Sequence, residues 1–423
     1  MNQPRQRIAI IGTGIGGLTA AWLLKDEHDV QLYEANDYAG GHTHTRVVHR
    51  NGVDWPVNTG FIVFNDWTYP NFIKLMDRLG VASEESDMSF SVDSEASGLQ
   101  YNGNRLNTLF AQRRNLLNPP FLRMVLEILR FNRLTRDDLA NDRIQDDEPL
   151  GSYLNRHGFS RYFRNHYIVP MGAAIWSAPE VVLEQFPVRF FLQFFNNHGM
   201  LSVDDRPTWR VLSGGSASYV HRMMATLGSR TRLNCPVTSV RREADQVLVS
   251  CADGTEAFDQ VVFACHSDQA LAMLADPTEA EREILGAIPY QMNDVVLHTD
   301  ESVLPSNRLA WAAWNYRVPA HATEPVSVTY NMNILQNFHQ SSETFCVTLN
   351  RTRDIDPDKI IDQYRYAHPV FSMEAVAAQQ RYHEIGGHNR SHFCGAYWFN
   401  GFHEDGVRSG LRVAQAFGLG LDS

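Results

Sequence analysis

Short apolar runs and glycine-rich or polar segments alternate over the first 34 residues of the chain. Residues 8–11 form an uninterrupted apolar run, which is typical of a strand buried in a parallel sheet. Glycines are frequent over residues 12–17, a helical pattern runs from Leu18 to about Lys25, and residues 30–34 form the next strand-like run. This order of strand, glycine turn, helix and strand predicts an α/β domain with a parallel sheet.

The glycine turn has the spacing Gly12-x-Gly14-x-x-Gly17, and Glu34 closes the second strand 20 residues after Gly14. Gly12 permits the tight turn, Gly14 lets the backbone approach a pyrophosphate, and Gly17 allows close helix packing. Glu34 would accept hydrogen bonds from a ribose and repel a 2′-phosphate, so FAD and NAD are favoured over NADP. The residues assigned to this phosphate and ribose site are Gly12, Gly14, Ile15, Gly16, Gly17, Glu34 and Ala35.

A second glycine pair, Gly40 and Gly41, precedes His42 and Thr43 soon after the ribose-binding acid. This segment resembles flavoproteins such as the monoamine oxidases, phytoene desaturases and flavin-type histone demethylases. In those proteins a Gly-Gly pair followed by a basic residue and a threonine lines the FAD phosphates. The resemblance implies that these four residues contact FAD. It also implies non-covalent binding, since no cysteine aligns with the covalent attachment site of monoamine oxidases.

Two later blocks extend the resemblance to the whole chain. A glycine turn at residues 213–216, a helix and the strands of residues 236–264 match the order in which that superfamily returns to its FAD domain. By resemblance, the Val237 backbone contacts adenine. The segment 393–410 looks like the closing motif of the family, which approaches the flavin pyrimidine edge. The contacts that it implies are made by Gly395, Ala396, Gly406 and Val407.

The three blocks predict an α/β fold with a Rossmann-like FAD-binding domain and an inserted substrate domain of helices and mixed sheet. The FAD-binding domain would comprise residues 1–65, 206–266 and 386–423. The substrate domain would comprise residues 67–205 and 267–385. The closest resemblance is to bacterial predicted NAD/FAD-binding, amine-oxidase-like proteins, whose genes are commonly associated with cyclopropane-fatty-acid synthase-like methyltransferases.

Four residues near the expected flavin ring bear on the chemistry. Ala396 replaces an acid that bonds the ribityl chain or a bridging water in many members. By the N-x-V-V-L pattern of residues 293–297, Asp294 occupies the position of a lysine that holds a water at flavin N5 in amine oxidases. Phe402 matches an aromatic-cage residue, which would suit an amine, an apolar chain or plain packing. Asp294, Phe402 and His403, a proton-transfer candidate, are therefore the predicted catalytic residues.

Composition narrows the class of protein further. The chain has 423 residues, and its 43% hydrophobic and 20% charged residues are typical of a soluble globular protein. A net charge of −11 disfavours nucleic acid as a partner. The five cysteines show no metal-ligand spacing, and no stretch has the length of a membrane span. We therefore expect no metal, no nucleic acid and a cytoplasmic location.

Residues 112–136 form a basic segment with six arginines and one acid, Glu127. Its leucines and other apolar residues recur at helical spacing, with Arg123 and Arg130 on the opposite face. Such a helix could lie on an anionic membrane surface, at the inner face of the membrane, or form a substrate-domain helix with a solvated face. The sequence leaves both interpretations open.

The function predicted from these features is that of an FAD-dependent oxidoreductase. Its substrate would be a fatty-acyl or isoprenoid lipid that passes a hydride to flavin N5, giving desaturation or a shifted double bond. Oxygen or an electron carrier would accept the electrons. A flavin amine oxidase and a non-catalytic lipid-binding or escort protein are the two alternatives.

Overall fold

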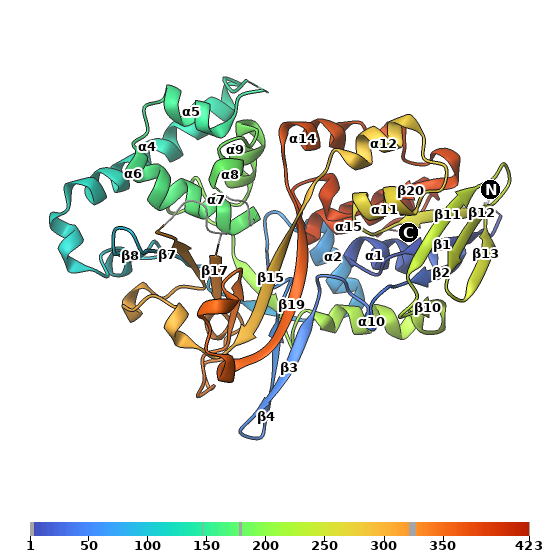
Figure 1. The fold of residues 1–423 in the computed structure, drawn as a ribbon, viewed down its shortest axis with the longest axis horizontal. Coiled ribbons are helices and arrows are strands. Elements are labelled where there is room, and N and C mark those ends of the chain that lie inside the picture. Colours follow the sequence, from blue (N-terminus) through green and yellow to red (C-terminus); the bar gives the residue numbers. More distant parts are fainter. Residues whose placement is uncertain (1–3, 146, 177–179, 321–326, 423) are drawn as a thin grey trace.

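A computed structural model describes residues 4–145, 147–176, 180–320 and 327–422. The molecule has two halves (Figure 1). The half that contains the N-terminus is built on a parallel sheet, and the other half combines a large mixed sheet with a lobe of helices. The long strands β15 (Tyr290–His298) and β19 (Ile360–Pro369) lie between the two halves.

The parallel sheet has five strands in the order β10-β2-β1-β14-β20. In register, Ile10 lies between Leu32 and Val262. The strands are β10 (Thr231–Arg232), β2 (Asp29–Tyr33), β1 (Arg7–Ile11), β14 (Gln260–Phe263) and β20 (Ser391–Phe393). They come from three chain segments that are far apart in sequence, so the predicted α/β architecture is confirmed.

Both faces of this sheet are covered, because successive side chains of a strand point to opposite faces. Ile8 and Ile10 pack against α1 (Ile15–Leu24), α2 (Pro70–Leu79), α10 (Ala217–Leu227) and α15 (His403–Ala416). Ala9 and Ile11 face a second layer. That layer contains β11 (Val237–Arg242), β12 (Val247–Cys251), β13 (Gly254–Phe258), α11 (Ser267–Met273), α12 (Glu279–Gly286) and α14 (Met373–Gln380).

Four of these helices belong to the segments predicted as substrate domain, namely α2, α11, α12 and α14. Helix α2 packs on α10 and α15, two of the helices that cover this sheet. Phe72, Leu75 and Met76 form an apolar stripe at helical spacing, and all three are buried in the core beneath the sheet. Helices from outside the predicted FAD-binding segments therefore contribute to the layers that cover the parallel sheet.

The second large sheet has seven strands in the order β19-β15-β18-β17-β16-β7-β8. All neighbours are antiparallel except β16 and β7. The strands not yet given are β18 (Cys346–Leu349), β17 (Ser327–Asn331), β16 (Trp314–Val318), β7 (Phe90–Ser94) and β8 (Leu99–Asn102). Smaller sheets are formed by β3 (Thr45–Arg50) with β4 (Val53–Asn58), and by β5 (Val63–Asn65), β9 (Trp209–Leu212) and β6 (Ser83–Glu85).

The helical lobe has its own core, in which Phe121, Phe131, Phe163 and Phe191 are fully buried. Its main helices are α4 (Pro119–Ala140), α5 (Leu150–Arg156), α7 (Val169–Trp176) and α9 (Val188–Asn197), with the shorter α3 (Leu106–Leu109), α6 (Arg161–Phe163) and α8 (Glu180–Leu183). A further short helix, α13 (Met332–Leu335), lies in the mixed-sheet region. Within the described residues, no helix is both long and apolar enough to span a bilayer.

Candidate functional site

The first glycine loop is shaped by contacts that only glycine allows. Gly12 has a φ of +105°, and a Cβ placed on it would lie 2.7 Å from the carbonyl oxygen of Ala264. A Cβ on Gly17 would lie 2.2 Å from the carbonyl oxygen of Gly12. By contrast, a Cβ on Gly14 would meet no atom within 4 Å. The backbone at Gly14 is therefore open, as a backbone that contacts a ligand must be.

This open position is the N-cap of α1. Ile15, Gly16 and Gly17 form the buried first turn, whose amides have no acceptor within the helix. Gly14 offers no side chain to cap them, and the first turn carries no acid. Unsatisfied amides and the positive end of the helix dipole make this turn suitable for an anion such as a pyrophosphate.

Glu34 lies directly after β2 and is 6% exposed. Its Oε2 accepts hydrogen bonds from the amide of Thr13 (3.0 Å) and from Thr13 Oγ1 (2.6 Å). Its Oε1 accepts bonds from the amide and from Nδ2 of Asn36, both at 2.9 Å. Ribose hydroxyls could bond this carboxylate by replacing the two side-chain donors. Thr13 and Asn36 were not predicted, whereas Ala35, which was, is exposed.

The second glycine pair lies against the first loop. The amide of Gly40 donates to Thr13 Oγ1 at 3.2 Å, and a Cβ on Gly41 would lie 3.1 Å from Gly14 Cα. The two motifs, separated by more than 20 residues in the sequence, therefore form one site. The spacing in sequence could not show that the two loops face each other.

The N-terminus of α15 reaches the same place. A Cβ on Gly406 would lie 2.4 Å from Ile15 Cγ2, and a Cβ on Gly410 would lie 2.5 Å from the carbonyl oxygen of Gly16. Only glycines let α1 and α15 approach this closely. The first turns of two helices, α1 and α15, therefore lie side by side, and both present backbone amides.

The amides predicted to face the flavin are not the available ones. The Gly406 amide donates to the carbonyl of Phe402 at 3.0 Å, and Val407 is buried one residue further into the helix. Phe402 is the N-cap, so the amides without an intrahelical acceptor belong to residues 403–405. The assignment to Gly406 and Val407 is corrected by one helical turn.

Three further predicted contacts lie at the edges of this site. The Gly395 amide donates to Ser409 Oγ at 2.8 Å and ties the end of β20 to α15, while Ala396 begins the short helix Ala396–Trp398. Val237 begins β11, two residues after Cys235. The amide of Cys235 donates to the carbonyl oxygen of Glu34 at 2.8 Å. Val237 therefore lies near the ribose end of the site.

His403 is held within the protein rather than presented to a substrate. Its ring stacks on Phe61 with a centroid distance of 3.5 Å, and its Nε2 lies 2.8 Å from Thr43 Oγ1 and 3.3 Å from the Tyr219 hydroxyl. Burial lowers the pKa of His403 well below its ordinary value. The structure thus favours a neutral positioning side chain over the predicted proton-transfer role.

The structure does not bring Asp294 to the site. Along β15, Asn293 and Val295 are buried while Asp294 is exposed, and its Oδ1 lies 3.5 Å from Nε of Arg365 on the outer surface. Strand side chains alternate in direction, so neighbours of the expected lysine position face opposite ways. The prediction that Asp294 is catalytic is therefore wrong, because the inward residue of this strand is Asn293.

Asn293 belongs to a group of polar side chains between the two halves. Its Nδ2 lies 3.2 Å from Nδ1 of His368. The rings of His42 and His368 are 5.6 Å apart, and those of His42 and His266 are 5.9 Å apart. Tyr366 lies 5.0 Å from His42, and Tyr290 stacks on His266 at 4.4 Å. We call His42, His266 and His368, with their two tyrosines, the histidine cluster.

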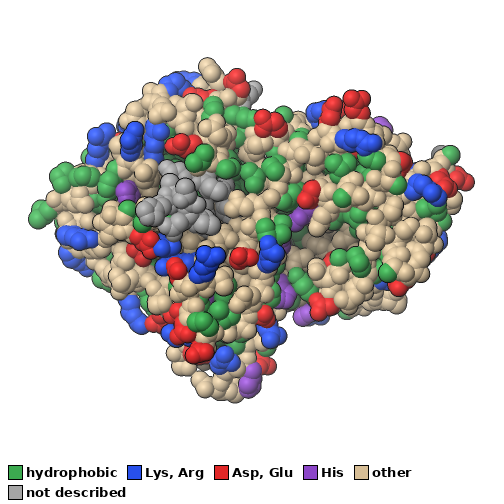
Figure 2. All heavy atoms as spheres, viewed as in Figure 1, with side chains coloured by type: hydrophobic (Ala, Val, Ile, Leu, Met, Phe, Trp, Pro, Cys, Tyr) green, Lys and Arg blue, Asp and Glu red, His purple; other side chains and the backbone are tan. Residues whose placement is uncertain are grey.

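The histidine cluster is uncharged at neutral pH. Burial, with a smaller effect of the neighbouring histidines, lowers the pKa of His42 and His266 to about 4 and that of His368 to about 3. Histidine side chains are visible in the depression between the halves in Figure 2. His266 was missed although it follows the carboxyl end of β14, where ligands bind in open α/β sheets.

Phenylalanines form the wall where the helical lobe meets α15. Phe402 stacks on Phe194 of α9 at 4.9 Å, and Phe190 of α9 lies 5.1 Å from Phe371. We call these four residues the phenylalanine wall. A cavity of about 400 Å³ adjoins Phe402 and includes His198 and Asp405. Burial raises the pKa of Asp405 to about 7, although its Oδ2 accepts bonds from the Phe402 and Asn400 amides.

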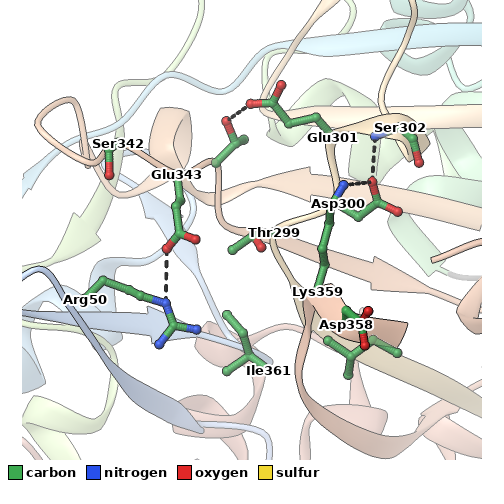
Figure 3. A pocket seen from close by; sticks show the side chains of 12 residues that line it. Arg50, Thr299, Asp300, Glu301, Ser302, Ser342, Glu343, Asp358, Lys359 and Ile361 are labelled. Atoms are coloured by element: carbon green, nitrogen blue, oxygen red, sulfur yellow. Dashed lines mark hydrogen bonds and ion pairs between the residues drawn. The ribbon is translucent and has the colours of Figure 1, made fainter. Parts of the chain in front are cut away.

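A second cavity, of about 500 Å³, is lined mainly by polar and charged side chains (Figure 3). Most of its charged groups already have hydrogen-bond or ion-pair partners. Arg50 Nε lies 3.1 Å from Glu343, Lys359 Nζ lies 3.3 Å from Asp300, and Thr344 donates to Glu301 at 2.6 Å. A cavity whose charges are already paired offers little to an apolar substrate.

Two cysteines that are far apart in the sequence meet in the structure. Pairing of β11 with β12 brings together Cys235, Cys251 and Asp253, whose ligand atoms all lie within 4.8 Å of one another. The spacing in sequence did not indicate this group. Burial raises the pKa of Cys235 to about 12, which disfavours the thiolate that a metal requires. The absence of a metal therefore stays a prediction.

Comparison with known proteins decides the family. A model of the flavin-containing amine oxidoreductases matches residues 15–417. The chain belongs to this family. Amine oxidase [flavin-containing] A of Sus scrofa is 25% identical over 258 residues, which are 57% of this chain and 46% of that protein. The match thus spans less than half of the length of these curated relatives.

Solved structures agree with the family in fold. Cyclohexylamine oxidase from Brevibacterium oxydans IH-35A superposes with a TM-score of 0.72 at 16% identity, covering 98% of this chain and 99% of that one. A CLA-producing fatty acid isomerase from P. acnes gives 0.70 at 17% identity, with the same coverage. The recognised resemblance and the fold class are therefore confirmed.

The cofactor of this flavin-containing family is FAD, and the site fits it. The open backbone at Gly14 and the free amides of α1 would hold the pyrophosphate, and buried Glu34 would hold the ribose. The amides of residues 403–405 lie beside this cradle. These features are those expected of residues that bind a dinucleotide.

Proposed function

We propose that the protein is an FAD-dependent oxidoreductase that acts on a hydrophobic lipid with a fatty-acyl or isoprenoid chain. The observation that carries this proposal is the junction of the cofactor cradle with the phenylalanine wall. Both are built on the start of α15, where Phe402 is the N-cap and Gly406 touches Ile15. FAD, when bound, supplies the acceptor of a hydride from the substrate.

The residues around the cradle have separate tasks in this proposal. The first turn of α1 and the Gly40–Gly41 pair bind phosphate, and Glu34 binds the ribose. The free amides at the start of α15 stabilise negative charge near the flavin. Phe402 and Phe194 exclude water and align an apolar chain.

The cleft carries no fixed charge at the histidine cluster. Its three imidazoles are neutral at pH 7 because burial lowers their pKa values. They offer hydrogen bonds without attracting an ion, which suits a substrate whose reacting part is uncharged. Desaturation would remove a hydride and a proton from adjacent carbons, whereas isomerisation would return the hydride to another carbon. Reoxidation after desaturation would use oxygen or an electron carrier.

An amine oxidase is the second candidate, favoured by the sequence match to amine oxidase A and by the cyclohexylamine oxidase fold. Aromatic side chains such as Phe402 can also orient an amine. The sequence of β15 argues against an amine oxidase. This strand contains no lysine, and its inward residue is Asn293. A non-catalytic lipid carrier is the third reading, and Ala396 in place of an acid is the feature that favours it.

The test has two steps. Mass spectrometry of the molecules released on denaturing the purified protein should find FAD together with an acyl or isoprenoid species. Anaerobic mixing with such lipids, and separately with primary and secondary amines, should bleach the flavin absorbance only with the lipid. Reduction by amines alone would favour the amine oxidase, and lipid without any flavin, even after incubation with FAD, would favour the carrier.

A matched pair of variants tests the phenylalanine wall. Phe402→Ala should lower the rate of flavin reduction by a long-chain lipid by about tenfold, because it removes the side chain that orders the chain. Phe417→Ala, at the other end of α15, should leave that rate within about twofold once stability is matched. Equal rates for the two variants would contradict a substrate at this wall.

A further inference from the structure

Helix α4 has two apolar faces, and the fold covers only one. Phe121, Met124 and Phe131 are fully buried in the core of the lobe. On the opposite side, Leu122, Leu126 and Leu129 are 38%, 66% and 50% exposed. The spacing i, i+4, i+7 places these three leucines in one stripe. The sequence places these leucines on the apolar face of the helix, and the structure leaves them exposed.

Further exposed leucines precede the helix. Leu116 and Leu117, just before α4, are 51% and 89% exposed, and Leu106 of α3 is 77% exposed. Arg113 joins these segments, because its Nη1 donates to the carbonyl oxygens of Asn107 and Phe110 at 3.1 and 2.8 Å. The exposed leucines of this surface are Leu106, Leu116, Leu117, Leu122, Leu126 and Leu129.

The same surface is strongly basic in a protein of net charge −11. The one acid of residues 112–136, Glu127, is buried and is bonded by Ser160 Oγ at 2.5 Å, with Arg123 at 3.4 Å. Among the described residues, no carboxylate lies within 4.0 Å of the guanidinium groups of the other arginines. The arginines are Arg113, Arg114, Arg123, Arg130, Arg133 and Arg136.

Hydrophobic side chains and Lys or Arg side chains lie next to each other at the left end of the molecule in Figure 2. Figure 1 places α4 and the segment after β8 at this end. We call the six leucines and six arginines the leucine–arginine surface. It projects away from the parallel sheet, at the outer end of the helical lobe.

We propose that the leucine–arginine surface docks the protein on an anionic lipid bilayer. Arginines pair with lipid phosphates at the depth at which flanking leucines enter the acyl region. A symmetric contact between two copies would place the same arginines against each other, which is unfavourable. A nucleic acid would use the arginines and leave the leucines in water. The bilayer is the one partner that satisfies both kinds of side chain.

This inference stands on the surface alone and does not depend on the proposed substrate. It has a consequence if that substrate is a lipid, since α4 packs in one core with α9, which carries Phe194 of the phenylalanine wall. The lobe that contacts the bilayer would then also border the active site.

The experiment is vesicle flotation of the full-length, FAD-loaded protein. Vesicles of phosphatidylglycerol mixed with phosphatidylcholine should carry the protein upward at low salt and release it at high salt. Vesicles of phosphatidylcholine alone should bind weakly. The pairs Leu117→Asn with Leu126→Asn, and Arg133→Glu with Arg136→Glu, should each lower partitioning by on the order of tenfold or more.

The controls remove equally exposed side chains elsewhere. Val53→Asn with Val203→Asn matches the leucine pair, since these valines are 47% and 57% exposed. Arg222→Glu with Arg282→Glu matches the charge reversals, because both arginines are exposed on helices α10 and α12. Both control pairs should float like the parent, and flavin content with circular dichroism should show that all variants fold.

Three results would overturn the proposal. One is failure of the parent protein to float with anionic vesicles at low salt. Another is equal loss of binding in the surface variants and the controls. The third is a stable dimer, seen by analytical ultracentrifugation, that the leucine variants dissociate, since this would assign the surface to a second copy. Because flotation is independent of turnover, these outcomes are distinguishable from failure of the proposed lipid substrate.

Discussion

The imidazole Nε2 of His403 lies 2.8 Å from the hydroxyl of Thr43, which itself lies 2.5 Å from the hydroxyl of Tyr219. This contact joins the second glycine loop to the first residue of α15 across 360 residues of sequence. The two parts of the cofactor site that are farthest apart in the chain are thus connected through one threonine.

Replacing Thr43 tests this connection. Thr43→Val keeps the shape of the side chain and leaves two buried polar groups, on His403 and Tyr219, with a lost partner. We expect the free energy of unfolding to fall by about 1–3 kcal/mol and FAD to dissociate more readily. Urea unfolding and flavin retention on gel filtration measure both. Thr226→Val, at an exposed helical position, is the control, and equal behaviour of the two variants would refute the role of the contact.

Gly14→Leu separates binding of the cofactor from folding. Because a Cβ at Gly14 meets no atom within 4 Å and its φ is −62°, the protein should fold normally. The side chain would occupy the phosphate cradle, so FAD affinity should fall at least about a hundredfold. Fluorescence titration of the apoprotein with FAD gives the affinity. Gly286→Ala, where a Cβ would make an ordinary contact, should bind FAD like the parent.

Substitutions at the neighbouring residues Asn293 and Asp294 should differ in their effect on stability. Asn293→Leu removes the partner of His368 Nδ1 and of Asn350 Nδ2, the latter at 2.8 Å, and should destabilise the protein by about 2 kcal/mol. Asp294→Ala breaks only an exposed ion pair and should change stability by less than about 0.5 kcal/mol. Thermal unfolding of both variants checks this. A larger effect at Asp294 would mean that the register of β15 is misassigned.

Three buried histidines outside the cofactor cradle predict loss of stability in mild acid. Burial lowers the pKa of His198, His298 and His392 to about 4. Nδ1 of His298 also accepts the Asp300 amide at 3.0 Å, which requires that nitrogen to be unprotonated. In the unfolded chain the pKa is about 6.5, so the unfolded state binds protons first. The contribution of these histidines to the free energy of unfolding is complete above about pH 6.5 and is lost as the pH falls to about 4.

Each of these histidines would contribute up to about 3 kcal/mol to that loss. Chemical unfolding of the apoprotein at a series of pH values measures it. Between about pH 4 and 6.5, the slope of the unfolding free energy against pH reports how many protons are bound on unfolding. His298→Gln should reduce this slope by the equivalent of about one proton. His49→Gln is the control, because the side chain of His49 is 70% exposed. An unchanged slope for both variants would contradict the assignment.

The sequence was most informative where local backbone geometry decides the structure. Gly12, Gly14, Gly17 and Glu34 lie as their spacing predicts, because a strand, turn and helix fix one another over a few residues. Asp294 shows the opposite case. A one-residue error in register turns a strand side chain to the other face, and no local pattern distinguished Asn293 from its neighbour.

Other features depend on contacts between distant segments. The histidine cluster draws its members from three segments, and only the meeting of the two halves brings them together. The sequence left open whether the leucines of α4 are exposed, since periodicity shows that a face is apolar and not whether it is covered.

The parallel sheet also determines when the protein can first hold its cofactor. Its edge strand β20 and helix α15 lie more than 350 residues after β1 and α1 in the sequence, yet β20 pairs with β14 and α15 packs on α1. The ribosome must release β20 and α15 before these contacts form, and such long-range contacts close slowly. Capture of the cofactor therefore requires a segment that is synthesised more than 350 residues after the glycine loop of residues 12–17.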